Sequence, residues 1–294
     1  MRSIRLRPPA PEKPEEPDAG FSRAAKVVAS IVANTTLLTA LVFYFGFVYT
    51  QWFFDHFHVH YTLLNQSTPE ILARGVDGLF MPLAAAAGVV LVLLCGVRYL
   101  KKRLAPKSWS AVLRVCTPLA ACAGVALVVA FGFVAADKSR SLGYPGLPGV
   151  ALAVGVLLLV FAWHQVIDGP IIVEAGIAFV LVTVGLFVAV ADYSIALGIQ
   201  QGRVVELRLP SDPDVLVYSA KSLNMTTDGV REVVCKEPEA AYRYRYDGLK
   251  LLLQSGGQLV LLPADWNSDQ GAAIVLPRTD SIRLEFTTTR PGSC

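Results

Sequence analysis

The chain has 294 residues, of which 54% are hydrophobic and 17% are charged, with a formal net charge of +3. Charged residues make up about a quarter of an ordinary soluble domain. This composition therefore argues against an ordinary soluble protein and indicates several membrane spans.

Five apolar runs are long enough to cross a bilayer, which takes about 20 residues for a helix. We expect helices because lipid offers no partner for backbone N–H and C=O groups. The spans are predicted at residues 27–54, 79–98, 110–136, 147–166 and 170–195, within a membrane domain at 27–200.

Lysine and arginine residues in the short connections indicate the orientation. Six of them precede the first span and four lie between the second and third spans, against one and two in the alternate connections. Basic residues are enriched in cytoplasmic loops. We therefore expect a multi-pass plasma-membrane protein with a cytoplasmic N-terminus and an external C-terminal domain.

The segments before and after the spans differ in character. Residues 1–26 contain five prolines among charges of both signs and are predicted to form a disordered cytoplasmic tail. Residues 203–294 are predicted to form an extracytoplasmic antiparallel β domain. Its expected strands are RVVELRL, DVLVYSA, AYRYRY, GLKLLLQ, QLVLLPA, AAIVLP and SIRLEF.

Two of the five cysteines, Cys235 and Cys294, fall in the outer domain, whereas the other three lie within apolar spans. An even pair in an oxidising compartment is a candidate disulfide. We expect the three cysteines in the spans to act as small hydrophobic residues.

Three histidines at alternate positions, His56, His58 and His60, raise the question of a metal site. In a strand the outer two lie about 13 Å apart, and in a helix His58 points away from the other two. Either conformation supplies at most two ligands, so the histidines are a weak metal candidate. We favour interfacial imidazoles and expect no cofactor.

Ionisable residues near the cytoplasmic ends of the spans form a second candidate group, consisting of Arg114, His164, Asp168 and Glu174. Charges at membrane depth are expensive and often mark a pathway. We favour an Arg114–Glu174 ion pair with interfacial neighbours over a conducting pathway, because the middle of the spans has few polar residues.

The expected partners are membrane lipids and a further protein chain. Small residues four apart, Ala84 with Gly88 and Ala120 with Gly124, allow close helix packing within one chain or in a homo-oligomer. Nucleic acid is not expected, because the tyrosines of AYRYRY fit a half-buried core strand and the domain has no basic patch. No catalytic motif occurs, so we expect a non-enzymatic protein.

Three segments carry a resemblance: STPEILARGVDGLFMPL, VLVYSAKSLNM and YRYDGLKLLLQSGGQLVLLPADW. They are similar to segments of uncharacterised actinobacterial multi-span membrane proteins, a resemblance that implies N-terminal spans and a C-terminal extracytoplasmic β-rich part. The predicted function is a binding, scaffolding or sensory module. The alternative is a small channel or transporter subunit that uses the cytoplasmic-side polar cluster.

Overall fold

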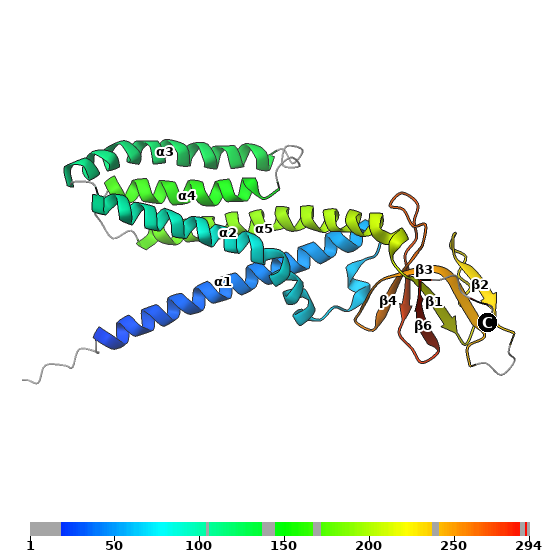
Figure 1. Ribbon diagram of the computed structural model, residues 1–294. Coiled ribbons are helices and arrows are strands. Elements are labelled where there is room, and N and C mark those ends of the chain that lie inside the picture. Colours follow the sequence, from blue (N-terminus) through cyan, green and yellow to red (C-terminus); the bar gives the residue numbers. More distant parts are fainter. Residues whose placement is uncertain are drawn as a thin grey trace, which may run out of the picture. The chain divides into compact units, whose positions relative to one another are not determined.

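The computed structural model describes residues 19–103, 106–136, 145–166, 172–236, 241–288 and 292 (Figure 1). The chain divides into two units, Met1–Ala40 and Leu41–Cys294. All contacts between elements described below lie within the second unit.

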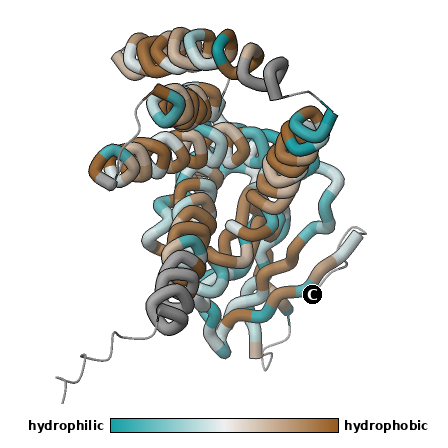
Figure 2. The backbone as a smooth tube through the Cα atoms, turned by 90° about the vertical axis from the view of Figure 1, so that its left-hand side faces the viewer, coloured by the Kyte–Doolittle hydropathy of each residue, from teal (hydrophilic) through white to brown (hydrophobic). Residues whose placement is uncertain are grey.

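Five helices in the described ranges are long and apolar enough to cross a membrane. They are α1 (Ala19–His56), α2 (Thr68–Arg103), α3 (Pro106–Ala136), α4 (Leu147–Val166) and α5 (Ile172–Arg208). The tube in Figure 2 is coloured mainly as hydrophobic residues along these helices. The predicted helical part is therefore confirmed, and the bounds of α4 coincide with the predicted span.

Two predicted boundaries are wrong. Helix α1 begins at Ala19, so residues 19–26 are helical, whereas residues 1–18 of the predicted disordered tail lie outside the described part. Helix α5 runs to Arg208, so RVVELRL is not the first strand. No glycine or proline interrupts residues 203–209, and packing of Val205 against a buried cluster overrides the β preference of its branched side chain.

The C-terminal part is an antiparallel sheet with six strands in the described residues, in the order β5-β4-β3-β1-β6, and β2 also pairs with β3. The strands are β1 (Asp214–Ser219), β2 (Arg231–Val234), β3 (Tyr244–Ser255), β4 (Gln258–Pro263), β5 (Ile274–Pro277) and β6 (Ile282–Thr287). The antiparallel prediction is confirmed, although β2 was not among the predicted strands.

The centre of the sheet buries polar groups as well as apolar ones. Tyr246 is fully buried, and its hydroxyl donates to Glu232 Oε2 at 2.6 Å and accepts the Leu223 N–H at 2.6 Å. Arg245, the neighbour of Tyr246 and therefore on the other face of the strand, is also buried, and Asp247 accepts hydrogen bonds from its Nε at 2.8 Å and its Nη2 at 3.1 Å. The sheet therefore has a buried ion pair that strand alternation did not predict.

Helices α3 and α4 lie side by side, as do α4 and α5 (Figure 1). A Cβ added to Gly124 of α3 would lie 2.9 Å from the Gly155 carbonyl oxygen of α4, so packing within the chain uses the Ala120 and Gly124 face. A Cβ on Gly88 would meet no described atom within 4 Å. The role of Ala84 and Gly88 in a homo-oligomer stays a prediction.

Candidate functional site at the helix–sheet junction

The sheet joins the helices through a shared hydrophobic core, which we call the junction cluster. Its members come from α1 and the connection after it, from the turn η3 (Leu209–Ser211), and from β4 and the loop after it. They are Phe53, Phe54, Phe57, Val59, Leu64, Leu209, Val260, Leu262 and Trp266. Each is at most 7% exposed, so the sheet is packed against the helix ends rather than linked to them by the chain alone.

Trp266 holds the loop between β4 and β5 against the end of α1. The centroid of its ring lies 5.0 Å from that of Phe57, 6.0 Å from that of His56 and 6.3 Å from that of His58. Aromatic pairs at these separations stabilise one another beyond the area they bury. Any shift of this loop therefore changes contacts at the end of α1.

Glu206 of α5 links three elements. Its Oε2 lies 2.9 Å from His56 Nε2 of α1, and its Oε1 accepts the Ser268 N–H of the β4–β5 loop at 3.0 Å. The side chains of His56 and Glu206 are only 13% and 22% exposed. Hydrogen bonds to a charged group at this depth are stronger than those between neutral groups.

The β3–β4 hairpin makes a second contact with the helical part. Ser255 Oγ donates to Glu70 Oε2 of α2 at 2.9 Å. A Cβ on Gly256 would lie 1.9 Å from the Leu64 carbonyl oxygen, and Gly256 has a φ of +55°. The position therefore requires glycine, for space as well as backbone conformation.

The three histidines adopt neither of the regular conformations considered from the sequence, because α1 ends at His56 and His58 has a φ of +58°. His56 contacts Glu206, His58 Nδ1 lies 3.3 Å from the Gly271 carbonyl oxygen, and His60 Nδ1 lies 2.7 Å from Thr62 Oγ1. Within the described ranges, no three His, Cys, Asp or Glu side chains are grouped to hold a metal ion.

A polar groove of about 350 Å³ lies beside the junction cluster in the sheet domain. It is lined by residues of the segment 226–228 and the segment 263–272, including Asp228, Asp265, Trp266, Asn267 and Gln270. Trp266 Nε1 is buried and has no hydrogen-bond partner among the described residues. Two carboxylates and two amides beside an indole can accept hydrogen bonds from hydroxyl or amine groups.

The predicted polar cluster is only partly described, since Asp168 lies outside the described residues. Arg114 lines an apolar cavity of about 710 Å³ together with Trp163 and Gln165, the neighbours of His164. Arg114, His164 and Glu174 are exposed. In the part of the chain that the structure describes, no ion pair joins Arg114 to Glu174.

The candidate disulfide stays a prediction, because Cys294 lies outside the described residues. The Cys235 N–H donates to the Arg243 carbonyl oxygen at 2.9 Å, beside the β2–β3 ladder. The Gly292 carbonyl oxygen accepts a hydrogen bond from Arg245 Nη1 at 2.6 Å, which brings the chain two residues before Cys294 to β3. Cys95, Cys116 and Cys122 are free.

Sequence reasoning missed Glu206 and Trp266, the two residues that organise the junction. Glu206 was placed in a strand, and a helical interpretation of RVVELR would have put it on α5. Trp266 stands in the turn sequence ADWNSDQG, where a large aromatic residue among polar ones indicates a contact with another element.

The described residues define a class of architecture: helices of membrane-spanning length whose ends share a buried core with a small antiparallel sheet. No family model matches the chain, and no curated protein or solved structure matches it either.

Proposed function

We propose that the chain is an integral plasma-membrane protein whose β domain acts outside the cytoplasm as a ligand-binding sensory module. Support for membrane insertion comes from the five apolar helices, and support for the orientation comes from the basic residues around them. With five spans, we expect the N-terminus and the sheet on opposite sides of the bilayer.

The position of Trp266 is the observation that carries the sensory role. This residue lines the groove and also packs against Phe57 at the end of α1. Gly271 likewise lines the groove, while its carbonyl oxygen lies beside His58. A ligand that displaces the 263–272 segment therefore changes contacts that reach α1 directly and α5 through Glu206.

The second candidate function is a small channel or transporter subunit. It is favoured by the cavity of about 710 Å³ between α3 and α4, whose mainly apolar lining includes Arg114 together with the polar residues Thr117 and Gln165. This arrangement leaves the groove without a role, so we prefer the sensory proposal.

Hydrogen exchange on the full chain in lipid nanodiscs tests the sensory role, with glucosamine as the probe for the groove. Its ammonium and hydroxyl groups match the carboxylates and amides there. We expect glucosamine to slow exchange in residues 264–272 and also in 53–60. The Asp265→Asn variant should lose both effects, and the control Asp280→Asn, outside the groove lining, should keep them. Slower exchange confined to the groove would contradict the sensory role.

Labelling of intact cells with an impermeant maleimide tests the orientation. An Asp280→Cys variant, changed at an exposed turn before β6, should gain a label that the unsubstituted protein lacks. A gain that requires membrane permeabilisation would place the sheet inside the cell and overturn the proposed topology.

A further inference from the structure

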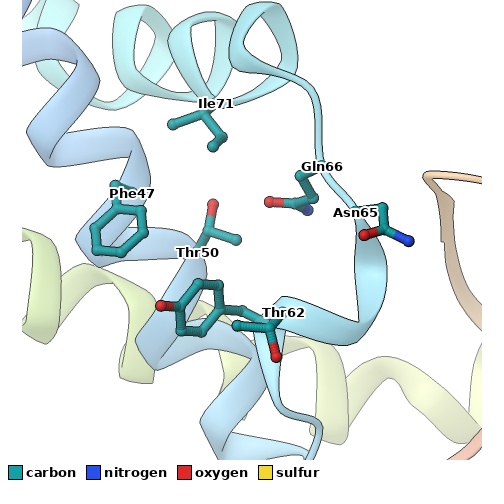
Figure 3. Close-up of a pocket in the computed structure, with 7 residues that line it drawn as sticks. Phe47, Thr50, Thr62, Asn65, Gln66 and Ile71 are labelled. Carbon is teal, nitrogen blue, oxygen red and sulfur yellow. The ribbon is translucent and has the colours of Figure 1, made fainter.

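A second cavity, of about 240 Å³, lies near the junction cluster but is lined by different residues (Figure 3). It is bounded by α1, the short helix η1 (Tyr61–Leu64), the connection that follows, and the first turn of α2. The lining residues are Phe47, Thr50, Tyr61, Thr62, Asn65, Gln66 and Ile71.

Two polar atoms of this cavity are buried without a partner. Thr50 is 2% exposed, and neither its Oγ1 nor Gln66 Nε2 makes a hydrogen bond to any described residue. Figure 3 shows the Thr50 hydroxyl and the Gln66 amide both facing the space enclosed by these elements. An unsatisfied buried polar group costs about 1–3 kcal/mol, so two in one cavity indicate that an occupant completes them.

The other lining groups restrict the chemistry of that occupant. None of the seven described lining residues carries a charge, and Phe47, Tyr61 and Ile71 supply apolar walls. The Thr62 hydroxyl is already engaged, because it lies 2.7 Å from His60 Nδ1. The site therefore suits an uncharged amphipathic group that has an acceptor for the Gln66 amide and a hydroxyl or carbonyl partner for Thr50.

The place of the cavity along the helices indicates where such a group comes from. The membrane-length segment of α1 ends at His56, and the cavity lies beside its last turns. On α2 the cavity lies beside the first turn, before the predicted span that begins at residue 79, in a stretch that carries Glu70, Arg74 and Asp77. In a bilayer this level is the interfacial region, which contains the ester groups of lipids. The volume corresponds to about eight water molecules, enough for a glycerol ester but not for a whole lipid.

We infer that this cavity binds the ester-bearing glycerol end of a neutral membrane lipid. The Gln66 amide donates to an ester carbonyl, Thr50 bonds the neighbouring glycerol oxygen, and Phe47 and Ile71 contact the start of an acyl chain. The inference rests on the membrane insertion proposed above, but not on the orientation or on a ligand in the groove.

The test measures thermal unfolding of the full chain in mild detergent as dioleoylglycerol is titrated into the micelles. We expect the midpoint to rise with lipid concentration, since a ligand that binds only the folded state stabilises it. Thr50→Val and Gln66→Leu should each weaken the apparent affinity by about five- to tenfold, the effect of one lost hydrogen bond. Thr39→Val in the same helix is the matched control, because its hydroxyl already donates to the Thr35 carbonyl oxygen at 2.9 Å.

Two soluble probes separate the sources of the ligand. Monoacetin carries the glycerol ester without a long chain, and glycerol carries neither ester nor chain. A rise of the midpoint with dioleoylglycerol alone supports binding of a membrane lipid. A response to monoacetin as strong as that to dioleoylglycerol would contradict the claim that the ligand is a membrane lipid. An equally strong response to glycerol would contradict the claim that the site recognises an ester. No shift with dioleoylglycerol, or equal shifts in all variants, overturns the site.

The variants themselves distinguish loss of binding from failure to fold. Thr50→Val removes an unpartnered buried hydroxyl, so without lipid its unfolding midpoint should equal or exceed that of the unsubstituted protein. A lower midpoint without lipid would show that the hydroxyl has a partner within the folded chain and would contradict the inference. This readout differs from the maleimide and glucosamine experiments, so failure of the proposed topology or groove is recognised separately.

Discussion

Replacing Glu206 with alanine tests whether the junction depends on this one carboxylate. The change leaves the Ser268 N–H and the His56 ring without the partners that lie at 3.0 and 2.9 Å. Hydrogen bonds to charged groups contribute about 1.5–3 kcal/mol each, and partial exposure of both side chains reduces that value. We therefore expect a loss of about 2–3 kcal/mol in the free energy of unfolding.

Thermal unfolding of the full chain, followed by near-ultraviolet circular dichroism, measures the effect. A loss of this size lowers the midpoint by about 5–10 °C in a chain with 150–250 cooperative residues. Glu206→Gln keeps an acceptor for Ser268 and should lose less. The control is Glu285→Ala, because Glu285 pairs with Arg283 at 2.6 Å while both side chains are about half exposed, a setting in which ion pairs contribute little. Equal midpoints for Glu206→Ala and Glu285→Ala would refute the role of Glu206.

Three further predictions concern the sheet and its hairpin. Burial raises the pKa of Tyr246 above its ordinary value of 10.0. This side chain therefore stabilises the fold fully below about pH 10 and loses that contribution as the pH rises through the folded-state pKa. Tyr246→Phe should make the fall of the unfolding midpoint at alkaline pH less steep. Asp247→Ala should lose about 3–5 kcal/mol because it leaves the Arg245 charge buried, and an Arg245→Met, Asp247→Leu double variant should lose less in the same unfolding assay. Gly256→Ala should lower the midpoint more than Gly257→Ala. Both positions have a positive φ, but only a Cβ at position 256 would meet a backbone atom. Equal losses would show that backbone strain alone matters.

The helices could be predicted from the sequence because a long apolar run in lipid has essentially one solution for its backbone hydrogen bonds. The positions at which the helices end were predicted less accurately. RVVELRL carries β-branched residues typical of a strand, yet it continues α5 because Val205 packs against the junction cluster and residues 203–209 contain neither glycine nor proline. Tertiary packing, absent from a local pattern, decided between the two structures.

The candidate site was less predictable than the fold for the same reason. The histidines were recognised as unusual, but the partner of His56 is Glu206, 150 residues later in the chain. The unpartnered state of Thr50 and Gln66 depends on how α1, η1 and α2 surround them. A pattern of residue types does not state which polar groups lack a partner after folding.

Two kinds of contact hold the sheet at the junction: apolar packing attaches it to the helices, and hydrogen bonds fix its orientation. Burial of apolar area is non-directional, so the junction cluster holds the sheet against the helices over a range of tilts. The Glu206–Ser268 and Glu70–Ser255 hydrogen bonds have narrow geometric limits, and they lie at two different loops of the sheet. Breaking one of them should therefore let the sheet tilt about the other without detaching. Under the proposed sensory role, a ligand beside Trp266 would act by disturbing the contact at Ser268, because Ser268 and Trp266 belong to the same loop.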